Sequence, residues 1–136
     1  MTDTRRTKSA FNAVRAIDYT VILARDWHAM RNFYEEILSF RLLRELSPGW
    51  VEYQVGPNIL TLARPQRLAS DQPTPMGSAS LQLAFKVGRD DVDRCAAELT
   101  RKGIALTEPP TDQSFGHRTL FFRDPDGNLL EVYADI

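Results

Sequence analysis

The order of predicted elements along the 136-residue chain repeats once, and this repeat constrains the fold more than any other feature. Each half opens with a β-branched, apolar stretch, continues with a helical pattern and closes with short extended stretches separated by turn residues. Because a long helical connection follows only the first strand of each half, the other strands are expected to pair mainly antiparallel. The sequence therefore predicts an α+β fold of two β-α-β-β-β modules, with helices on the outside of the sheets.

The first module is expected at about residues 14–64. An apolar strand at 16–24 is followed by Asp26, a residue type that caps helices, and by apolar side chains at helical spacing between Trp27 and Leu38. Three further strands then follow, separated by turn dipeptides. In order, they are expected at 41–46, at 50–55 and from Asn58, with Pro48-Gly49 and Gly56-Pro57 between them.

Residues 65–79 are rich in proline, serine and other polar residues, without periodicity, and are predicted to link the two modules. The second module is expected at about 80–136, where Asp90 or Asp91 caps a helix that ends at Gly103. Its strands are expected at 80–88, 104–107, 119–122 and 129–133. Since residues 1–13 lack this patterning, they are expected to form a flexible arm before a single domain that spans 14–136.

Charge and composition narrow the classes of partner. A net charge of −1 and a pI of about 6.1 give no basic surface of the kind that nucleic acids or anionic membranes require, so a small-molecule partner is favoured. No apolar run reaches the length of a membrane span, and the N-terminus has no apolar core of a secretory signal, so a cytoplasmic protein is expected. The single cysteine, Cys95, excludes an internal disulfide and falls on the apolar side of its helix.

The end of the chain carries the most specific motif. Residues 115–136, FGHRTLFFRDPDGNLLEVYADI, combine a strand, a DPDGN turn and a returning strand with a glutamate in its middle. Together with YTVILARDWHAMRNFYEEILSFRLL at 19–43, this motif resembles the glyoxalase/bleomycin-resistance/dioxygenase superfamily, also called the vicinal oxygen chelate proteins. The resemblance covers nearly the whole chain. It implies curled, cup-like sheets and, in the enzymes of the family, a divalent metal that chelates adjacent oxygens of the substrate.

In that family, the metal ligands come from four inward-facing positions, one each on the first and fourth strands of both modules. The resemblance places Tyr19, Thr61, Gln82 and Glu131 at these positions. Histidine is expected on the first strands, but Tyr19 and Gln82 stand there, and only Glu131 is a usual ligand of zinc or iron. His117 and Arg118, which lead into the seventh strand, are further candidates for ligand contact.

Two functions follow as hypotheses. The first is a protein that binds a small, partly apolar molecule in the cup without a metal, since the histidine ligands are missing. The alternative is a metal-dependent lyase, transferase or dioxygenase that uses Glu131 to hold zinc, iron, nickel or manganese, with His117 as a substitute ligand. Whether the chain is an enzyme stays open, and a module without any ligand is a third hypothesis. The resemblance also implies a homodimer, in which the linker is the hinge if modules exchange between chains.

Overall fold

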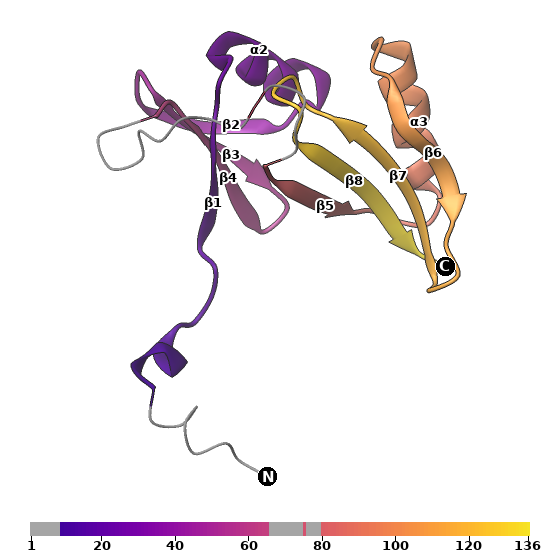
Figure 1. Cartoon of the computed structure of the whole chain (residues 1–136), viewed down its shortest axis with the longest axis horizontal. Coiled ribbons are helices and arrows are strands. Elements are labelled where there is room, and N and C mark those ends of the chain that lie inside the picture. Colours follow the sequence, from indigo (N-terminus) through magenta and orange to yellow (C-terminus); the bar gives the residue numbers. More distant parts are fainter. Residues whose placement is uncertain (1–8, 66–74, 76–79) are drawn as a thin grey trace.

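The computed structural model describes residues 9–65, 75 and 80–136, and these residues form two sheets of four strands each (Figure 1). The first sheet has the strand order β1-β4-β3-β2, and the second has the order β5-β8-β7-β6. In both sheets the first and last strands of the module pair in parallel, and the other pairs are antiparallel. The α+β fold of two β-α-β-β-β modules is confirmed. Most of the predicted linker lies outside the described residues.

The first module forms the elements that its sequence predicts, with one change in the helix. Asp26 caps α2 (Trp27–Asn32), and its carboxylate accepts a hydrogen bond from the backbone N–H of Ala29. The predicted longer helix continues only as one wider, π-helical segment, η2 (Phe33–Ile37), which brings two aromatic rings into the core. The strands are β1 (Tyr19–Leu23), β2 (Arg41–Ser47), β3 (Trp50–Val55) and β4 (Asn58–Ala63).

The second module follows the same order. Its helix, α3 (Asp91–Arg101), starts after Asp90, which occupies the N-cap position without a capping hydrogen bond from its side chain. The strands are β5 (Gln82–Lys86), β6 (Leu106–Asp112), β7 (His117–Arg123) and β8 (Leu129–Asp135). β6 begins later and runs further than predicted, because Pro109 and Pro110 do not end a strand at the edge of its sheet. In the described part of the chain, no helix is long and apolar enough to cross a membrane.

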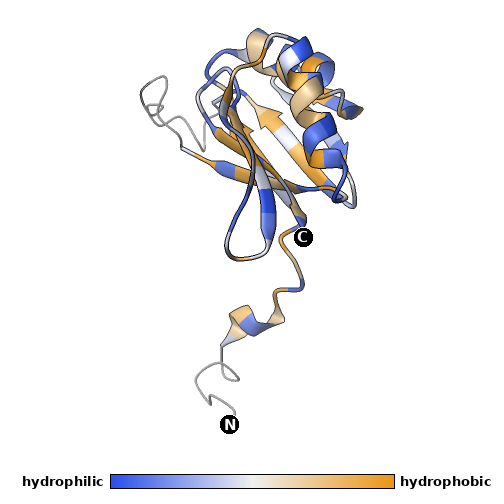
Figure 2. Cartoon of the chain, turned by 90° about the vertical axis from the view of Figure 1, so that its right-hand side faces the viewer, coloured by the Kyte–Doolittle hydropathy of each residue, from blue (hydrophilic) through white to orange (hydrophobic). Residues whose placement is uncertain are grey.

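One hydrophobic core joins the two modules. Each sheet turns one face toward the helices, and in Figure 2 the strands behind the helices are largely apolar. Phe33 of the first module lies against Phe122 of the second with ring centroids 6.2 Å apart, and Phe40 meets Phe85 at 5.5 Å. Because these rings lose their contact with water only when both modules are folded, the stability of one module depends on the other.

The other face of each sheet, here called the distal face, is turned away from the helices. Side chains alternate between the two faces along a strand, and directly paired residues share a face. Since Leu130 and Val132 are buried in the core, Glu131 between them lies on the distal face of the second sheet. By the same alternation with Leu60 and Leu62, Thr61 lies on the distal face of the first sheet.

Candidate functional site

The second sheet brings two of the predicted site residues together. Gln82 on β5 and Glu131 on β8 share the distal face, and Gln82 Nε2 donates a long hydrogen bond of 3.4 Å to Glu131 Oε1. Glu131 is half-buried and Gln82 is exposed, so the carboxylate can be reached from this face. Phe121 pairs with Glu131, and Tyr133 follows it by two residues along β8. The result is a carboxylate set into a partly apolar sheet surface.

The first sheet holds the other two predicted positions. Thr61 on β4 is completely buried, and its Oγ1 is the one buried side-chain oxygen or nitrogen that has no partner among the described residues. Tyr19, two residues before the partner of Thr61 on β1, is half-exposed. Its ring meets Trp50 edge-on, at a centroid distance of 6.1 Å. A buried hydroxyl and a tyrosine ring therefore occupy the two positions of the first sheet at which the family resemblance leads one to expect metal ligands.

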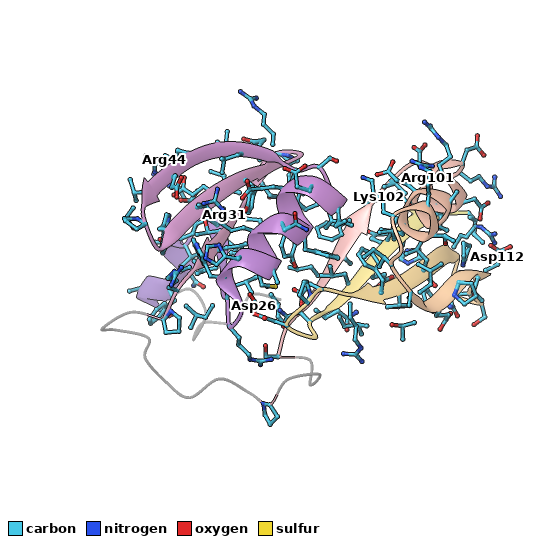
Figure 3. The ribbon with its side chains drawn as sticks, turned by 90° about the horizontal axis from the view of Figure 1, so that it is seen from above. Asp26, Arg31, Arg44, Arg101, Lys102 and Asp112 are labelled. Atoms are coloured by element: carbon cyan, nitrogen blue, oxygen red, sulfur yellow. The ribbon has the colours of Figure 1, made fainter. Side chains whose placement is uncertain are left out.

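Glu52 is a distal-face residue that the sequence patterns do not single out. It lies directly opposite Thr61 and accepts hydrogen bonds from Arg44 Nε and Trp50 Nε1, both at 2.8 Å. These bonds hold the pKa of the Glu52 carboxyl below its usual value. Figure 3 places Arg44 on the outer strand of the first sheet, from which it reaches this carboxylate. The alternation of side chains along β3 is the signal that could have found it, because Trp50 and Glu52 share one face.

His117 and Arg118 lie on opposite faces of β7. His117 Nε2 is 3.3 Å from a carboxylate oxygen of Asp135, and its ring stacks on Tyr133 at 4.5 Å. It lies roughly 13 Å along the strand from the position that pairs with Glu131. Arg118 turns toward the helix, where it pairs with Asp93 on α3 and with Asp112 on β6. The structure thus groups His117 with the distal face, at its far end, whereas Arg118 fastens α3 to its sheet.

The DPDGN turn is buried and joins the modules, whereas its sequence pattern alone predicts only a chain reversal. Asp124 accepts hydrogen bonds from the hydroxyl of Tyr34 at 2.8 Å, from the side chain of Asn128 at 2.9 Å, and from two backbone N–H groups of the turn. Asp126 accepts from the backbone N–H groups of Arg25 and Asp26, at 2.6 and 3.1 Å. The turn of the second module therefore fixes the start of helix α2 in the first.

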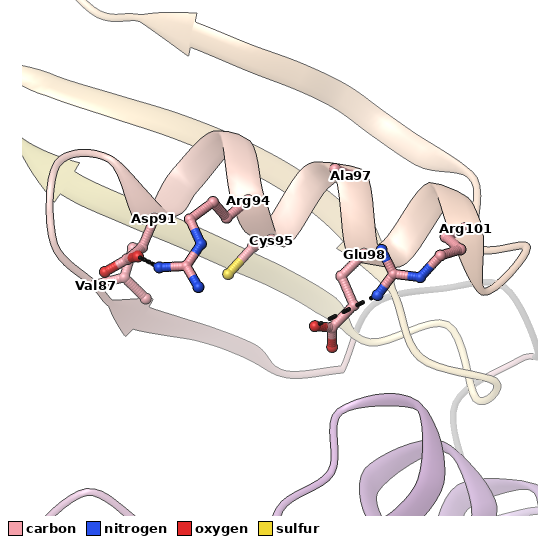
Figure 4. A pocket seen from close by; sticks show the side chains of 7 residues that line it. All are labelled: Val87, Asp91, Arg94, Cys95, Ala97, Glu98 and Arg101. Atoms are coloured by element: carbon pink, nitrogen blue, oxygen red, sulfur yellow. Dashed lines mark hydrogen bonds and ion pairs between the residues drawn. The ribbon is translucent and has the colours of Figure 1, made fainter.

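A separate hollow of about 500 Å³ lies along α3 (Figure 4). Its charged side chains already have partners, since Arg94 binds Asp91 at 2.9 Å and Arg101 lies 3.9 Å from Glu98. Burial, together with the nearby acidic side chains, raises the pKa of the Cys95 thiol, which keeps it protonated at neutral pH. The hollow therefore offers no reactive group, and the distal faces remain the candidate site.

The donors on the distal faces do not fit the metal that the resemblance implies. The four ligand positions offer one carboxylate, one amide, one phenol and one hydroxyl, whereas zinc and iron sites are built from imidazole, thiolate and carboxylate groups. The carboxylate of Glu52, which pairs with Thr61 across β3 and β4, is held by Arg44 and Trp50. Within the described residues, no three side chains of histidine, cysteine, aspartate or glutamate could hold one ion together.

Comparison with known proteins identifies the family. The sequence matches the Glyoxalase/Bleomycin resistance protein/Dioxygenase superfamily over residues 16–132. The chain belongs to this superfamily. The uncharacterized protein YwkD of Bacillus subtilis is 29% identical over 126 residues, which cover 88% of this chain and 97% of YwkD.

Solved structures of this superfamily share the fold. A glyoxalase/bleomycin resistance protein/dioxygenase from Nocardioides matches with a TM-score of 0.80 at 18% identity, over 98% of this chain and 90% of that one. Lactoylglutathione lyase from Agrobacterium tumefaciens matches with a TM-score of 0.73 at 23% identity, over 90% of this chain and 95% of that one. The predicted family and its cup-like α+β fold are confirmed.

Proposed function

We propose that this chain binds a small, partly apolar molecule on the distal face of its sheets, and that it does so without a divalent metal. The observation that carries the proposal is the Gln82–Glu131 pair, in which the side-chain amide of Gln82 donates to the accessible carboxylate. The same face exposes parts of Phe121 and Tyr133. One charged acceptor among flat apolar side chains suits a planar molecule that carries a single donor or cationic group.

Each remaining site residue has a role in this proposal. Glu131 accepts a hydrogen bond from the polar end of the ligand, and Gln82 fixes the carboxylate. Tyr19 contributes an aromatic edge, and Thr61 lies buried beneath the same face, with a hydroxyl that has no partner among the described residues. His117 borders the site at the far end of β7 and selects by size or charge. The arginine beside it is left out, because it binds Asp93 and Asp112 on the other face.

Metal content and ligand binding, measured on one preparation, test the proposal. Protein purified without chelators is analysed for zinc, iron, nickel and manganese, and planar amines and phenols are screened by ligand-observed NMR. We expect substoichiometric metal and a bound compound whose affinity falls at least about tenfold in Glu131→Leu, as expected when a charged hydrogen bond is lost.

Glu98→Gln is the matched control, since Glu98 is an exposed carboxylate on α3, away from the distal face. It should leave binding unchanged. Stoichiometric metal that is lost in Glu131→Leu and kept in Glu98→Gln would overturn metal-independent binding in favour of a metal-dependent enzyme. Equal binding by both variants would remove Glu131 from the site.

A further inference from the structure

The segment before β1 exposes three large apolar side chains that its own chain does not cover. This arm, residues 9–18, leads away from the sheets and contains the short 3-10 helix η1 (Ala10–Ala13) (Figure 1). Phe11, Val14 and Ile17 are 82%, 65% and 87% exposed. The hydrogen bonds found in the described part of the arm, such as that from the N–H of Val14 to the carbonyl of Phe11, join arm residues to one another. Three large apolar side chains with this exposure, within seven residues, are the observation from which the inference starts.

Charge favours a second copy of this chain as the molecule that holds the arm. Residues 1–18 carry four basic and two acidic side chains, a net charge of +2, and the total of −1 therefore leaves −3 on residues 19–136. The arm of one copy and the body of another thus attract each other. Since the arm leads away from its own sheets, it can reach a neighbouring copy without folding back.

The distal face of the second sheet has the chemistry that the arm needs. Leu129, Phe121 and Tyr133 are only half-buried there, and Glu131 lies among them. We propose that the arm of one copy lies across this face of a second copy, with its apolar side chains on this strip and Arg15 toward Glu131. In a two-fold dimer each arm covers the sheet of the other subunit.

The arm would then close the proposed ligand site with residues of the partner copy. This part of the inference rests on the proposed function, whereas the contact between arm and sheet needs no ligand.

Cross-linking between isotopically distinct copies tests the contact. Phe11 is replaced by photo-reactive benzoylphenylalanine in an equal mixture of unlabelled and heavy-isotope-labelled full-length chains, and the cross-linked peptides are identified by mass spectrometry. We expect links between a light and a heavy chain, from position 11 to peptides of β5, β7 or β8. Links within one chain only, or links between chains that end on other strands, would overturn the proposal.

Sedimentation velocity measures how much the arm contributes. In a variant that combines Phe11→Ser, Val14→Ser and Ile17→Ser, we expect the dimer dissociation constant to rise by about a hundredfold or more, because three large apolar side chains leave the interface. The control Leu46→Ser removes an apolar side chain that is 58% exposed on β2, and should change the constant by less than about twofold. An unchanged constant in the triple variant would contradict the inference.

Vesicle binding and ligand binding distinguish this inference from a membrane-binding arm and from a failure of the proposed function. If the wild type binds anionic phospholipid vesicles and the triple variant does not, while both dimerise equally, the arm belongs to a membrane surface and the inference is wrong. If the protein binds the ligand but no cross-links form, this inference alone is contradicted. If cross-links form and Glu131→Leu leaves ligand binding unchanged, only the proposed function is contradicted.

Discussion

The two modules close with the same strand–turn–strand unit, but their turns lie in different surroundings. Between β3 and β4, the turn at Gly56-Pro57 is exposed, as is Asn58 after it. Between β7 and β8, Asp124, Asp126 and Asn128 are 4%, 2% and 2% exposed, and the side chains of Asp124 and Asp126 bind the first module. The repeated module determines the course of the backbone. The side chains of the turn determine whether that turn is a surface loop or a buried contact between the modules.

The distal faces differ in the same way. Thr61 and Glu131 hold corresponding positions, yet Thr61 is buried without a partner in the described part of the chain, whereas Glu131 is accessible and bound by Gln82. On the first sheet, the neighbouring carboxylate of Glu52 is already held by two side chains. The first sheet thus holds its carboxylate with side chains of its own, whereas the carboxylate of the second sheet stays accessible to a ligand.

Removal of the central carboxylate of the buried turn should have the largest effect. Asp124→Ala leaves the Tyr34 hydroxyl and the donors of the turn without an acceptor, so we expect the free energy of unfolding to fall by about 3–4 kcal/mol. Pro57→Ala in the exposed turn should cost less than about 0.5 kcal/mol. Urea unfolding measures both. If Asp124→Ala does not fold, Asp124→Asn, which keeps part of the acceptor capacity, should fold with a smaller loss of stability. Equal losses of stability at the two turns would contradict the comparison.

The two asparagines that follow the turns test the same contrast with one substitution. Asn128 donates to Asp124 at 2.9 Å and accepts from Ser80 at 2.9 Å, so Asn128→Ala should cost about 2 kcal/mol. Asn58 begins β4 and is exposed, so Asn58→Ala should cost less than about 0.5 kcal/mol. Thermal unfolding of the two variants at one protein concentration gives the difference, and a larger loss at Asn58 would show that the first turn is the more important one.

The sequence is sufficient for the order of elements and for the capping of α2, because both depend on local periodicity and local side chains. It does not reveal the buried turn. The partner of Asp124 is Tyr34, 90 residues away, and no local pattern in DPDGN distinguishes a surface loop from a turn that binds the other module. Long-range contacts of this kind exist only once the modules pack.

The face on which a side chain lies is the second point that local patterns leave open. Glu131 pairs with Phe121, and this register sends His117 to the distal face and Arg118 to the helix side. A change of one residue in the turn would reverse that assignment. His117 and Arg118, which are neighbours in sequence, therefore lie on different faces, and only His117 shares the face of Glu131.

The hydrogen bond between Tyr34 and Asp124, which joins the two modules, can be tested through the pH dependence of stability. Burial and the neighbouring Asp124 raise the pKa of Tyr34 well above its usual value. A group with a raised folded pKa contributes stability that is fully present below its unfolded pKa, near 10, and that is lost as the pH rises above this value. We therefore expect the wild type to lose stability above about pH 10, and Tyr34→Phe to lose it less steeply, after a cost of about 1.5 kcal/mol at neutral pH.

Tyr53→Phe is the counterpart within the first module. The pKa of Tyr53 is also raised, by burial and by its hydrogen bond of 2.7 Å to Glu35. Glu35 keeps Arg31 at 2.7 Å when the Tyr53 hydroxyl is removed, so the neutral-pH cost should be smaller than for Tyr34→Phe. Urea midpoints from neutral pH to about pH 11 compare the variants. A larger loss of stability at neutral pH for Tyr53→Phe would mean that the Tyr34–Asp124 bond between the modules is the weaker of the two hydrogen bonds.

The smallest effect, and the one of opposite sign, is expected at Thr61. Thr61→Val removes a buried hydroxyl that has no partner, so the free energy of unfolding should rise by about 0.5–1 kcal/mol in the absence of ligand. Thr119→Val is the matched control on the other sheet, because Thr119 is equally buried but its hydroxyl accepts a hydrogen bond of 3.0 Å from Gln113. That variant should lose about 1 kcal/mol. Differential scanning calorimetry resolves the signs. A loss of stability in both variants would show that the Thr61 hydroxyl is satisfied in the free protein.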